Sequence, residues 1–271
     1  MDIEIRDDFD LRKIHESGQC FRWEPIGDNA FRIPHQGECL CIRKLADGWY
    51  SLDCTPGEFE ALWRPYFDLD EDYARIRSRI DRREDPYLYR ASQAGQGIRI
   101  LRQDLWETLI AFIISQNRNI PAIRRSVELL CHAAGERRED RSGRAYYSFP
   151  DPESVAALDD EALRECRLGY RCRYVKAAAE HVLDGKLNAG ALQSVSDREL
   201  LEEPMKVCGV GIKVASCVAL FALHRTDAFP IDTWIRKVLE TEYPAGWPYE
   251  KYRPYNGVFQ QYLFAYRRSG D

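Results

Sequence analysis

The spacing of apolar residues changes once along this chain, near residue 55, and that change limits the folds that the chain can adopt. The segments before it alternate in the manner of β-strands and are separated by short turns rich in Gly, Asp and Asn. Four strands are predicted: QCFRWE (19–24), AFRIP (30–34), ECLCIRK (38–44) and WYSLDC (49–54). Close spacing with short connections indicates that these strands pair antiparallel.

From Pro56 onward, apolar residues recur three and four positions apart, which is the spacing of helices. The longest apolar run, LIAFII at 109–114, belongs to a segment that is apolar nearly all round, so we expect a central, buried helix there. Asp104 precedes that helix and Glu107 follows three residues later, which predicts a capping box. The charged segment 135–144 lacks periodicity and is predicted to be an exposed loop.

These patterns together predict an α+β fold. An antiparallel-sheet domain is expected over residues 1–99, and an all-helical domain over residues 100–271. The longest apolar run is far shorter than a membrane span requires, and the acidic amino end, MDIEIRDDFD, does not resemble a signal peptide. We therefore expect a cytoplasmic protein with no membrane partner, and a monomer in the absence of any oligomerisation signal.

The charge and cysteine content exclude some classes of site. The 39 basic and 44 acidic residues give a net charge of -5, so the overall balance does not indicate a polyanionic partner. Only eight of the basic residues are lysine, and arginine suits phosphates and base edges. The nine cysteines include no CxxC pair, which predicts neither a disulfide framework nor a zinc site.

A helical hairpin is predicted near residues 197–224. The segment DRELLEEPMK (197–206) predicts a short helix, and VCGVG then leads into a second helix that starts near Ile212. The amides of the turn, at Gly209, Val210 and Gly211, and the start of the second helix would point outward and accept a phosphate without reading sequence. A Gly-x-Gly turn that is only structural remains the commoner alternative.

Lys213 follows this turn and shares a helix face with Cys217 and Leu220. A cation on that largely apolar face is poorly solvated. Partial burial and the start of a helix both favour the neutral amine, which is a nucleophile. The alternative is a lysine that extends from the first turn into solvent.

Asp232 precedes a helical pattern and is predicted to be its N-cap, which is the usual role of aspartate there. If the two helices pack together, this carboxylate faces Lys213. An amine beside a carboxylate can attack an electron-poor carbon while developing positive charge on a sugar is stabilised.

Several motifs resemble those of DNA glycosylases. VCGVGIKVASC followed by FPID is similar to the helix-hairpin-helix, Gly/Pro-rich loop and Asp signature, and the lysine resembles the bifunctional branch. Four further motifs resemble the eukaryotic-type 8-oxoguanine DNA glycosylases, in that family's order: SGQCFRW (17–23), SQNRNIPAI (115–123), LGYRCRYV (168–175) and PYNGVFQQYLF (254–264). The resemblance implies a TBP-like amino-terminal antiparallel sheet and two all-helical subdomains, with the active site in the cleft between the subdomains.

The resemblance implies a reaction in base-excision repair. Lys213 corresponds to the nucleophile at the sugar C1′, and Asp232 to the residue that assists departure of the base. A Schiff base and strand nicking by β-elimination would follow, without a metal or other cofactor. The implied partner is double-stranded DNA that contains oxidised guanine, and the protein would be nucleoid-associated if bacterial.

The resemblance also implies a base pocket. Gly18 resembles the position whose carbonyl accepts the N–H that distinguishes oxidised guanine from guanine. Cys217 and Phe264 resemble the walls between which the flipped base stacks, and Gln260 the amide on its Watson–Crick edge. For each of these residues a purely structural role is the alternative.

Asn117, Tyr170 and Arg171 resemble the group that fills the gap in the duplex and holds the orphaned cytosine. Ala122 stands where the animal enzymes have a second cytosine-reading arginine, so weaker discrimination for the opposite cytosine is expected.

Two further departures from the family pattern are visible. Trp234 stands where the animal enzymes have a histidine, and Cys208 replaces a common proline of the turn. The sequence has no cysteine after Asp232, so we do not expect the iron–sulfur cluster of some relatives.

Two other functions remain open at this point. One is a glycosylase for alkylated bases or mispaired adenine, although such enzymes without lyase activity usually lack a lysine at position 213. The other is a non-catalytic DNA-binding module in which Lys213 contacts the backbone.

Overall fold

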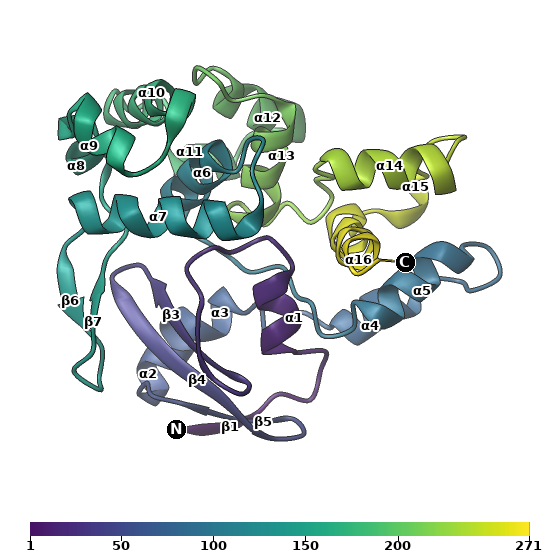
Figure 1. Cartoon of the computed structure of the whole chain (residues 1–271). Helices are drawn as coiled ribbons and strands as arrows, with labels where there is room; N and C mark the ends of the chain where they lie inside the picture. Colours follow the sequence, from purple (N-terminus) through teal and green to yellow (C-terminus); the bar gives the residue numbers. More distant parts are fainter. Residues whose placement is uncertain (271) are drawn as a thin grey trace.

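The computed structural model describes residues 1–270, with only the backbone for Ala189. A five-stranded antiparallel sheet has the order β1-β5-β4-β3-β2 and lies at the amino-terminal end of the molecule (Figure 1). Its strands are β1 (Asp2–Glu4), β2 (Glu24–Gly27), β3 (Ala30–His35), β4 (Glu38–Ala46) and β5 (Trp49–Leu52). The α+β fold class and the antiparallel pairing are therefore confirmed.

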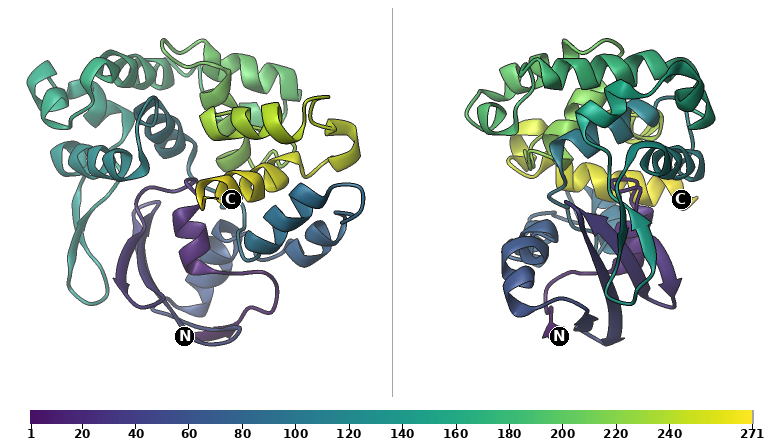
Figure 2. Two further views of the ribbon diagram at one scale, coloured as in Figure 1. Left: turned by 45° about the vertical axis from the view of Figure 1, so that its right-hand side comes forward. Right: turned by 90° about the vertical axis from the view of Figure 1, so that its left-hand side faces the viewer.

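Helices make up most of the remaining chain, and those from α6 to α14 lie above the sheet in the views of Figures 1 and 2. They are α1 (Leu11–Glu16), α2 (Pro56–Glu58), η1 (Phe59–Trp63), α3 (Arg64–Tyr66), α4 (Tyr73–Ser78), α5 (Pro86–Ala94), α6 (Leu105–Ile114), α7 (Ile120–Ala134), α8 (Pro152–Ala157), α9 (Asp160–Glu165), η2 (Gly169–Arg171), α10 (Cys172–Leu183), α11 (Ala189–Gln193), α12 (Asp197–Met205), α13 (Ile212–Phe221), α14 (Thr233–Glu242), α15 (Tyr249–Tyr252) and α16 (Asn256–Arg268). No helix of the described chain is long and apolar enough to cross a bilayer.

One strand prediction was wrong in detail, and one strand of the sheet was missed. Only Glu24 of the segment 19–24 lies in a strand, because side chains before it are used in contacts between the sheet and the helices. The Gln19 side chain bonds the backbone of Arg99 and Leu101. Strand β1 was not predicted, since the three residues that pair with β5 have no alternating apolar pattern.

The segment predicted to be a loop at 135–144 instead contributes to a two-stranded hairpin of β6 (Arg137–Glu139) and β7 (Ala145–Tyr147). This hairpin extends from the helical part down beside the sheet (Figure 1). Arg138 Nη1 and the Tyr146 hydroxyl both donate to the carbonyl of Gly37, and buried Arg32 donates to Ala145 O. The strands are too short and too exposed to produce a period-two signal, yet they connect the two parts of the molecule.

Two hydrophobic clusters form the core. One lies between the sheet, α1 and residues 56–67, and the other lies within the helices. Buried residues of α4 and α5 belong to the helical cluster, and α5 packs along α16. The division of the chain at residue 99 stays a prediction, although these two helices before it pack with the helical side.

Helix α6 is buried from Thr108 to Ile114 and packs against α7, α10 and α13, as predicted for a central helix. Asp104 caps it by accepting from Glu107 N at 2.8 Å. The capping box is only half formed, because the Glu107 side chain turns into the interior instead of back to the cap. Burial raises the pKa of Glu107 to about 7, although nearby Arg22 lowers it.

Candidate active site

The predicted helical hairpin is formed by α12, a turn at residues 206–211, and α13. Gly209 has φ +83°, and a Cβ there would lie 2.3 Å from the Tyr174 ring, so only glycine fits. Gly211 is the N-cap of α13 without a side-chain cap, and a Cβ there would meet nothing within 4 Å. The start of α13 therefore presents uncapped amides at an open surface, whereas Val210 N is bonded to Val207 O.

Lys213 projects from the first turn of α13 toward the end of α6. Its Nζ donates to Ser115 Oγ at 3.2 Å and lies 4.9 Å from the centre of the Phe112 ring. Cys217, one turn further along α13, is fully buried beside it. Burial raises the pKa of the Cys217 thiol to about 11, with Lys213 acting in the opposite direction. The Cys217 side chain is therefore a neutral, apolar neighbour of the amine.

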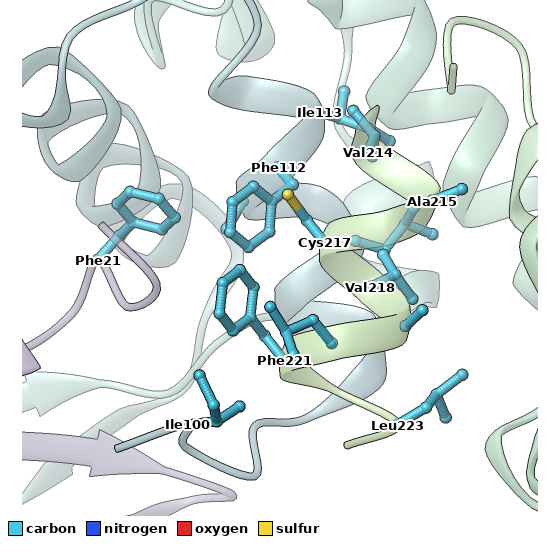
Figure 3. Close-up of a cluster of buried hydrophobic side chains, with 14 of the residues drawn as sticks. Phe21, Ile100, Phe112, Ile113, Val214, Ala215, Cys217, Val218, Phe221 and Leu223 are labelled. Carbon is cyan, nitrogen blue, oxygen red and sulfur yellow. The ribbon is translucent and has the colours of Figure 1, made fainter. Parts of the chain in front are cut away.

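Three phenylalanine rings pack against one another next to Lys213 and Cys217. The rings of Phe112 and Phe221 are stacked with centroids 5.4 Å apart, and Phe21 meets Phe112 edge-on at 5.5 Å. Figure 3 shows the Cys217 sulfur directed toward Phe112 among these rings. The amine of Lys213 thus stands at the border of a packed apolar core, where its position is restricted.

Asp232 is the N-cap of α14, as predicted. Its Oδ1 accepts from Trp234 N at 3.0 Å and from Ile235 N at 2.8 Å. Its Oδ2 accepts no hydrogen bond from the described residues, so one carboxylate oxygen remains available. Asp232 also raises the pKa of the Cys217 thiol through its negative charge, and it lines the same cavity as Lys213.

A cavity of about 800 Å³ brings most of the predicted site residues together. Its walls come from the loop after α1, the segment between α6 and α7, α13, the start of α14, and α16. Seven predicted residues line it: Gly18, Asn117, Lys213, Cys217, Asp232, Gln260 and Phe264. Tyr170, Arg171 and the turn residues Gly209, Val210 and Gly211 are not among the lining residues, which fits contacts outside a base pocket.

Gly18 and Phe264 are in direct contact across the cavity wall. Gly18 has φ +76°, and a Cβ there would lie 3.1 Å from Phe264 Cε1. Gln260, one turn before Phe264 on α16, is almost fully buried, and its Nε2 donates to Pro230 O at 2.9 Å. The backbone of Gly18, the ring of Phe264 and the amide of Gln260 therefore converge on one space.

The residues predicted to contact the opposite strand differ in exposure. Asn117 has φ +52° and is exposed, and Tyr170 is 51% exposed. Arg171 is only 4% exposed and stacks on Tyr170, with its Nε donating to Gln116 O at 3.0 Å and its Nη1 to Leu168 O. Arg171 thus holds the 115–119 loop against η2, and contact with a base would require it to release these carbonyls.

Several lining residues were missed by sequence reasoning. Ser115 and Gln261 lie inside motifs that were recognised, and Arg268 lies just beyond one. Arg268 donates to Glu16 O at 2.8 Å and sits over the Phe264 ring. No group of three or more metal-ligating side chains is placed to hold an ion among residues 1–270.

Comparisons with known proteins match most of the chain. Residues 3–109 match the family model of the 8-oxoguanine DNA glycosylase amino-terminal domain, and residues 110–252 match the HhH-GPD superfamily of base excision DNA repair proteins. A Saccharomyces cerevisiae protein named N-glycosylase/DNA lyase is 35% identical, over 86% of this chain and 68% of its own length.

Two solved structures are similar over nearly their full length. A structure of MBOgg1 with a low-affinity DNA ligand has a TM-score of 0.92 and 38% identity, covering 99% of this chain and 95% of that one. The Clostridium acetobutylicum 8-oxoguanine glycosylase/lyase, bound to double-stranded DNA with cytosine opposite 8-oxoG, has a TM-score of 0.89 and 33% identity, covering 99% and 98%.

Proposed function

The chain belongs to the 8-oxoguanine DNA glycosylase family within the HhH-GPD superfamily of base excision repair proteins, and from this we propose that it excises 8-oxoguanine from double-stranded DNA and then nicks the strand. It is a bifunctional N-glycosylase and abasic-site lyase. Its partner is duplex DNA that contains the oxidised base, and its place in the cell is with the DNA. A cytoplasmic, nucleoid-associated location in a bacterial cell is the finer proposal.

The position of the Lys213 amine is the observation that carries this proposal. The amine borders a cavity large enough for one extruded nucleotide base and is oriented by Ser115 and Phe112. In its neutral form it attacks the sugar C1′, and the electrons of the glycosidic bond leave with the base. Loss of the amine proton and ring opening give a Schiff base, which allows β-elimination of the 3′ phosphate.

Asp232 supports base departure in this scheme. The two amide bonds to Oδ1 fix the carboxylate at the start of α14, while Oδ2 faces no partner among the described residues. A fixed negative charge stabilises the positive charge that develops on the sugar as the base leaves. Because the cap geometry holds the carboxylate before the reaction, no reorganisation is needed at that moment.

The base pocket is proposed from the convergence described above. The extruded base stacks between Phe264 and Cys217, the Gly18 carbonyl accepts its N7–H, and Gln260 meets its Watson–Crick edge. A Cβ at position 18 would press on the Phe264 ring at 3.1 Å, so glycine leaves this ring in place beside the base.

The remaining predicted residues are proposed to hold the DNA. The open amides at Gly211 and the start of α13 bind a backbone phosphate, and Gly209 allows the turn to form. Val210 anchors that turn through its buried side chain. Exposed Asn117 and Tyr170 enter the gap left by the extruded base, with Arg171 beneath them.

Borohydride trapping tests the proposal directly. The protein is incubated with a duplex carrying one 8-oxoguanine opposite cytosine, and borohydride should reduce the Schiff base to a covalent protein–DNA adduct. Lys213→Gln should abolish the adduct and base release while retaining duplex binding. Lys206→Gln, which removes an exposed lysine paired with Glu203 on the same hairpin, is the matched control and should trap normally.

Two outcomes would contradict the proposal that the protein is a glycosylase and lyase with Lys213 as its nucleophile. If Lys213→Gln still forms the adduct, another amine is the nucleophile. If the wild-type protein releases no 8-oxoguanine and Lys213→Gln only weakens binding and its salt dependence, the protein is a DNA-binding module. Duplexes with alkylated bases or mispaired adenine, run in parallel, identify a different glycosylase.

A further inference from the structure

We propose that Gln261 is a positioning residue of the base pocket, whose side-chain N–H locks the orientation of the neighbouring Gln260 amide and thereby restricts the base edge that Gln260 accepts. This inference rests on the proposed function and deepens it. No role in the reaction was predicted for Gln261 from the sequence.

The two amides form a short hydrogen-bonded chain that starts at the backbone. Gln260 Nε2 donates to Pro230 O at 2.9 Å, and Gln261 Nε2 donates to Gln260 Oε1 at 3.0 Å. Both side chains line the cavity and are nearly fully buried, with 3% and 4% exposed. Solvent therefore does not compete for these groups.

The Pro230 carbonyl fixes the order of donors and acceptors along this chain. A carbonyl oxygen can only accept, so Gln260 must turn its NH₂ group toward Pro230. Its Oε1 then faces Gln261, and only the NH₂ group of Gln261 can satisfy it. Because each amide has one donor end and one acceptor end, Oε1 of Gln261 is left over.

That leftover oxygen is the second observation. Gln261 Oε1 is buried and has no hydrogen-bond partner among the described residues. A buried acceptor without a partner lowers stability relative to an apolar side chain of the same length. The Gln261 amide therefore lowers stability through its unpaired oxygen. Its contribution to the cavity is the hydrogen bond that it donates to Gln260.

A locked amide distinguishes two classes of purine. The guanine edge presents the O6 acceptor beside the N1–H donor, whereas the adenine edge presents the N6–H donor beside the N1 acceptor. A freely rotating Gln260 amide satisfies either order. Pro230 and Gln261 fix the orientation of the Gln260 amide. When the base is held between Phe264 and Cys217, this fixed amide matches the guanine order of donor and acceptor and not the adenine order.

Gln261→Met is the decisive variant, because it keeps the length of the side chain and removes its donor. Excision of 8-oxoguanine opposite cytosine under single-turnover conditions should fall about 10-fold or more, since the reading amide is no longer held in place. The ratio of 8-oxoguanine to 8-oxoadenine excision should fall as well. Nicking of a duplex with a preformed abasic site, which carries no base to read, should stay at the wild-type rate.

Stability provides an independent check on the same variant. Because Gln261→Met removes one unpaired buried oxygen and leaves another, Gln260 Oε1, without its donor, its melting temperature should stay close to that of the wild type. Gln93→Met, at an exposed position of α5, is the matched control and should leave all four measurements unchanged. Gln261→Glu, which places a second acceptor against Gln260 Oε1, should reduce excision at least as much as Gln261→Met.

The outcomes separate this inference from the proposed function. Suppose that the wild-type protein excises 8-oxoguanine. If Gln261→Met then excises it at the wild-type rate, or with the wild-type ratio of 8-oxoguanine to 8-oxoadenine, the positioning role alone is overturned. Equal losses of excision and abasic-site nicking in that variant also overturn it, because they indicate a general structural defect. Failure of the wild-type protein to excise 8-oxoguanine overturns the proposed function, whatever Gln261 does.

Discussion

Lys213 Nζ donates a hydrogen bond to Ser115 Oγ across 3.2 Å, which joins the first turn of α13 to the residue that ends α6. Ser115 uses its own hydroxyl proton to bond Phe112 O at 2.8 Å. Its lone pairs are therefore free to accept from the amine. The serine thus sets the direction in which the Lys213 amine points.

Replacing Ser115 should slow chemistry without weakening binding. In Ser115→Ala the amine loses its acceptor, and we expect single-turnover excision of 8-oxoguanine to fall about 10-fold, with unchanged affinity for the duplex. Quenched-flow assays and filter binding measure the two quantities. Ser78→Ala, an exposed serine of α4, is the control, and an unaltered excision rate in Ser115→Ala would show that the hydroxyl does not orient the amine.

Two substitutions of Asp232 should separate its cap from its charge. Asp232→Asn keeps an oxygen for the amides of Trp234 and Ile235, so its melting temperature should match the wild type, while base release slows about 100-fold or more. Asp232→Ala should lose the charge and the cap, costing about 0.5–2 kcal/mol of unfolding free energy in addition. Base release at the wild-type rate in Asp232→Asn would remove the carboxylate from the mechanism.

A methyl group at Gly18 should obstruct the proposed base pocket. The added Cβ lies 3.1 Å from Phe264 Cε1, so the ring must shift into the space for the base, and excision should fall about 10-fold or more, whereas abasic-site nicking changes little. Gly48→Ala is matched for backbone strain, with φ +74° and only ordinary contacts. Both variants should lose about 1–2 kcal/mol of stability, and only Gly18→Ala should lose excision.

The two glycines of the hairpin turn should respond differently to alanine. In Gly209→Ala the Cβ overlaps the Tyr174 ring, and we expect a loss of about 2 kcal/mol or more in unfolding free energy. Gly211→Ala has open space and should lose about 1 kcal/mol or less, yet bind duplex DNA about 10-fold more weakly because its methyl stands where a phosphate approaches. Gly57→Ala, in α2, is a neutral control. If Gly211→Ala binds duplex DNA as tightly as this control, the phosphate binds elsewhere.

Glu107 should make the protein less stable as the pH rises. Burial raises its pKa from 4.5 to about 7, so between these values the folded protein retains a proton that the unfolded chain has released. The contribution of Glu107 to the unfolding free energy therefore falls with rising pH across this window and stays lower above it. Burial lowers the pKa of His15 and of His35 to about 4, so these two groups contribute a rise with pH up to about 6.5. The difference in unfolding free energy between Glu107→Gln and the wild type should therefore grow with rising pH between about 4.5 and 7, by up to about 3 kcal/mol.

Urea unfolding at several pH values between 4.5 and 8 measures this effect. Glu180→Gln, at an exposed position of α10, is the control and should follow the wild type. A wild-type profile retained in Glu107→Gln would show that another group titrates in this range.

Sequence reasoning succeeded where the signal is local. Alternating apolar residues located β3, β4 and β5, and a nearly continuous apolar run located the buried α6. The N-cap at Asp232 and the face that Lys213 shares with Cys217 are helix-start and helix-period features, which a single segment determines. The gathering of most motif residues around one cavity is consistent with the resemblance from which their roles were predicted.

Features that depend on distant segments were not predictable in this way. The bond between Lys213 and Ser115 spans 98 residues, and no pattern around either residue specifies it. Glu107 has the spacing of a capping box, but burial against the sheet domain overrides that local preference. Gln261 has the same residue type as Gln260, and only the direction of the Pro230 carbonyl distinguishes their roles.

The Gln116 side chain donates to the Gly209 carbonyl at 3.0 Å, and it therefore ties the hairpin turn to the loop that carries Asn117. Under the proposed roles, the hairpin turn binds the sugar–phosphate backbone, and the Asn117 loop lies beside the gap that the extruded base leaves in the stack. The bond keeps the span between those two points constant. The length of strand between the bound phosphate and the vacated stack is therefore set by the protein and not by the base that is extruded.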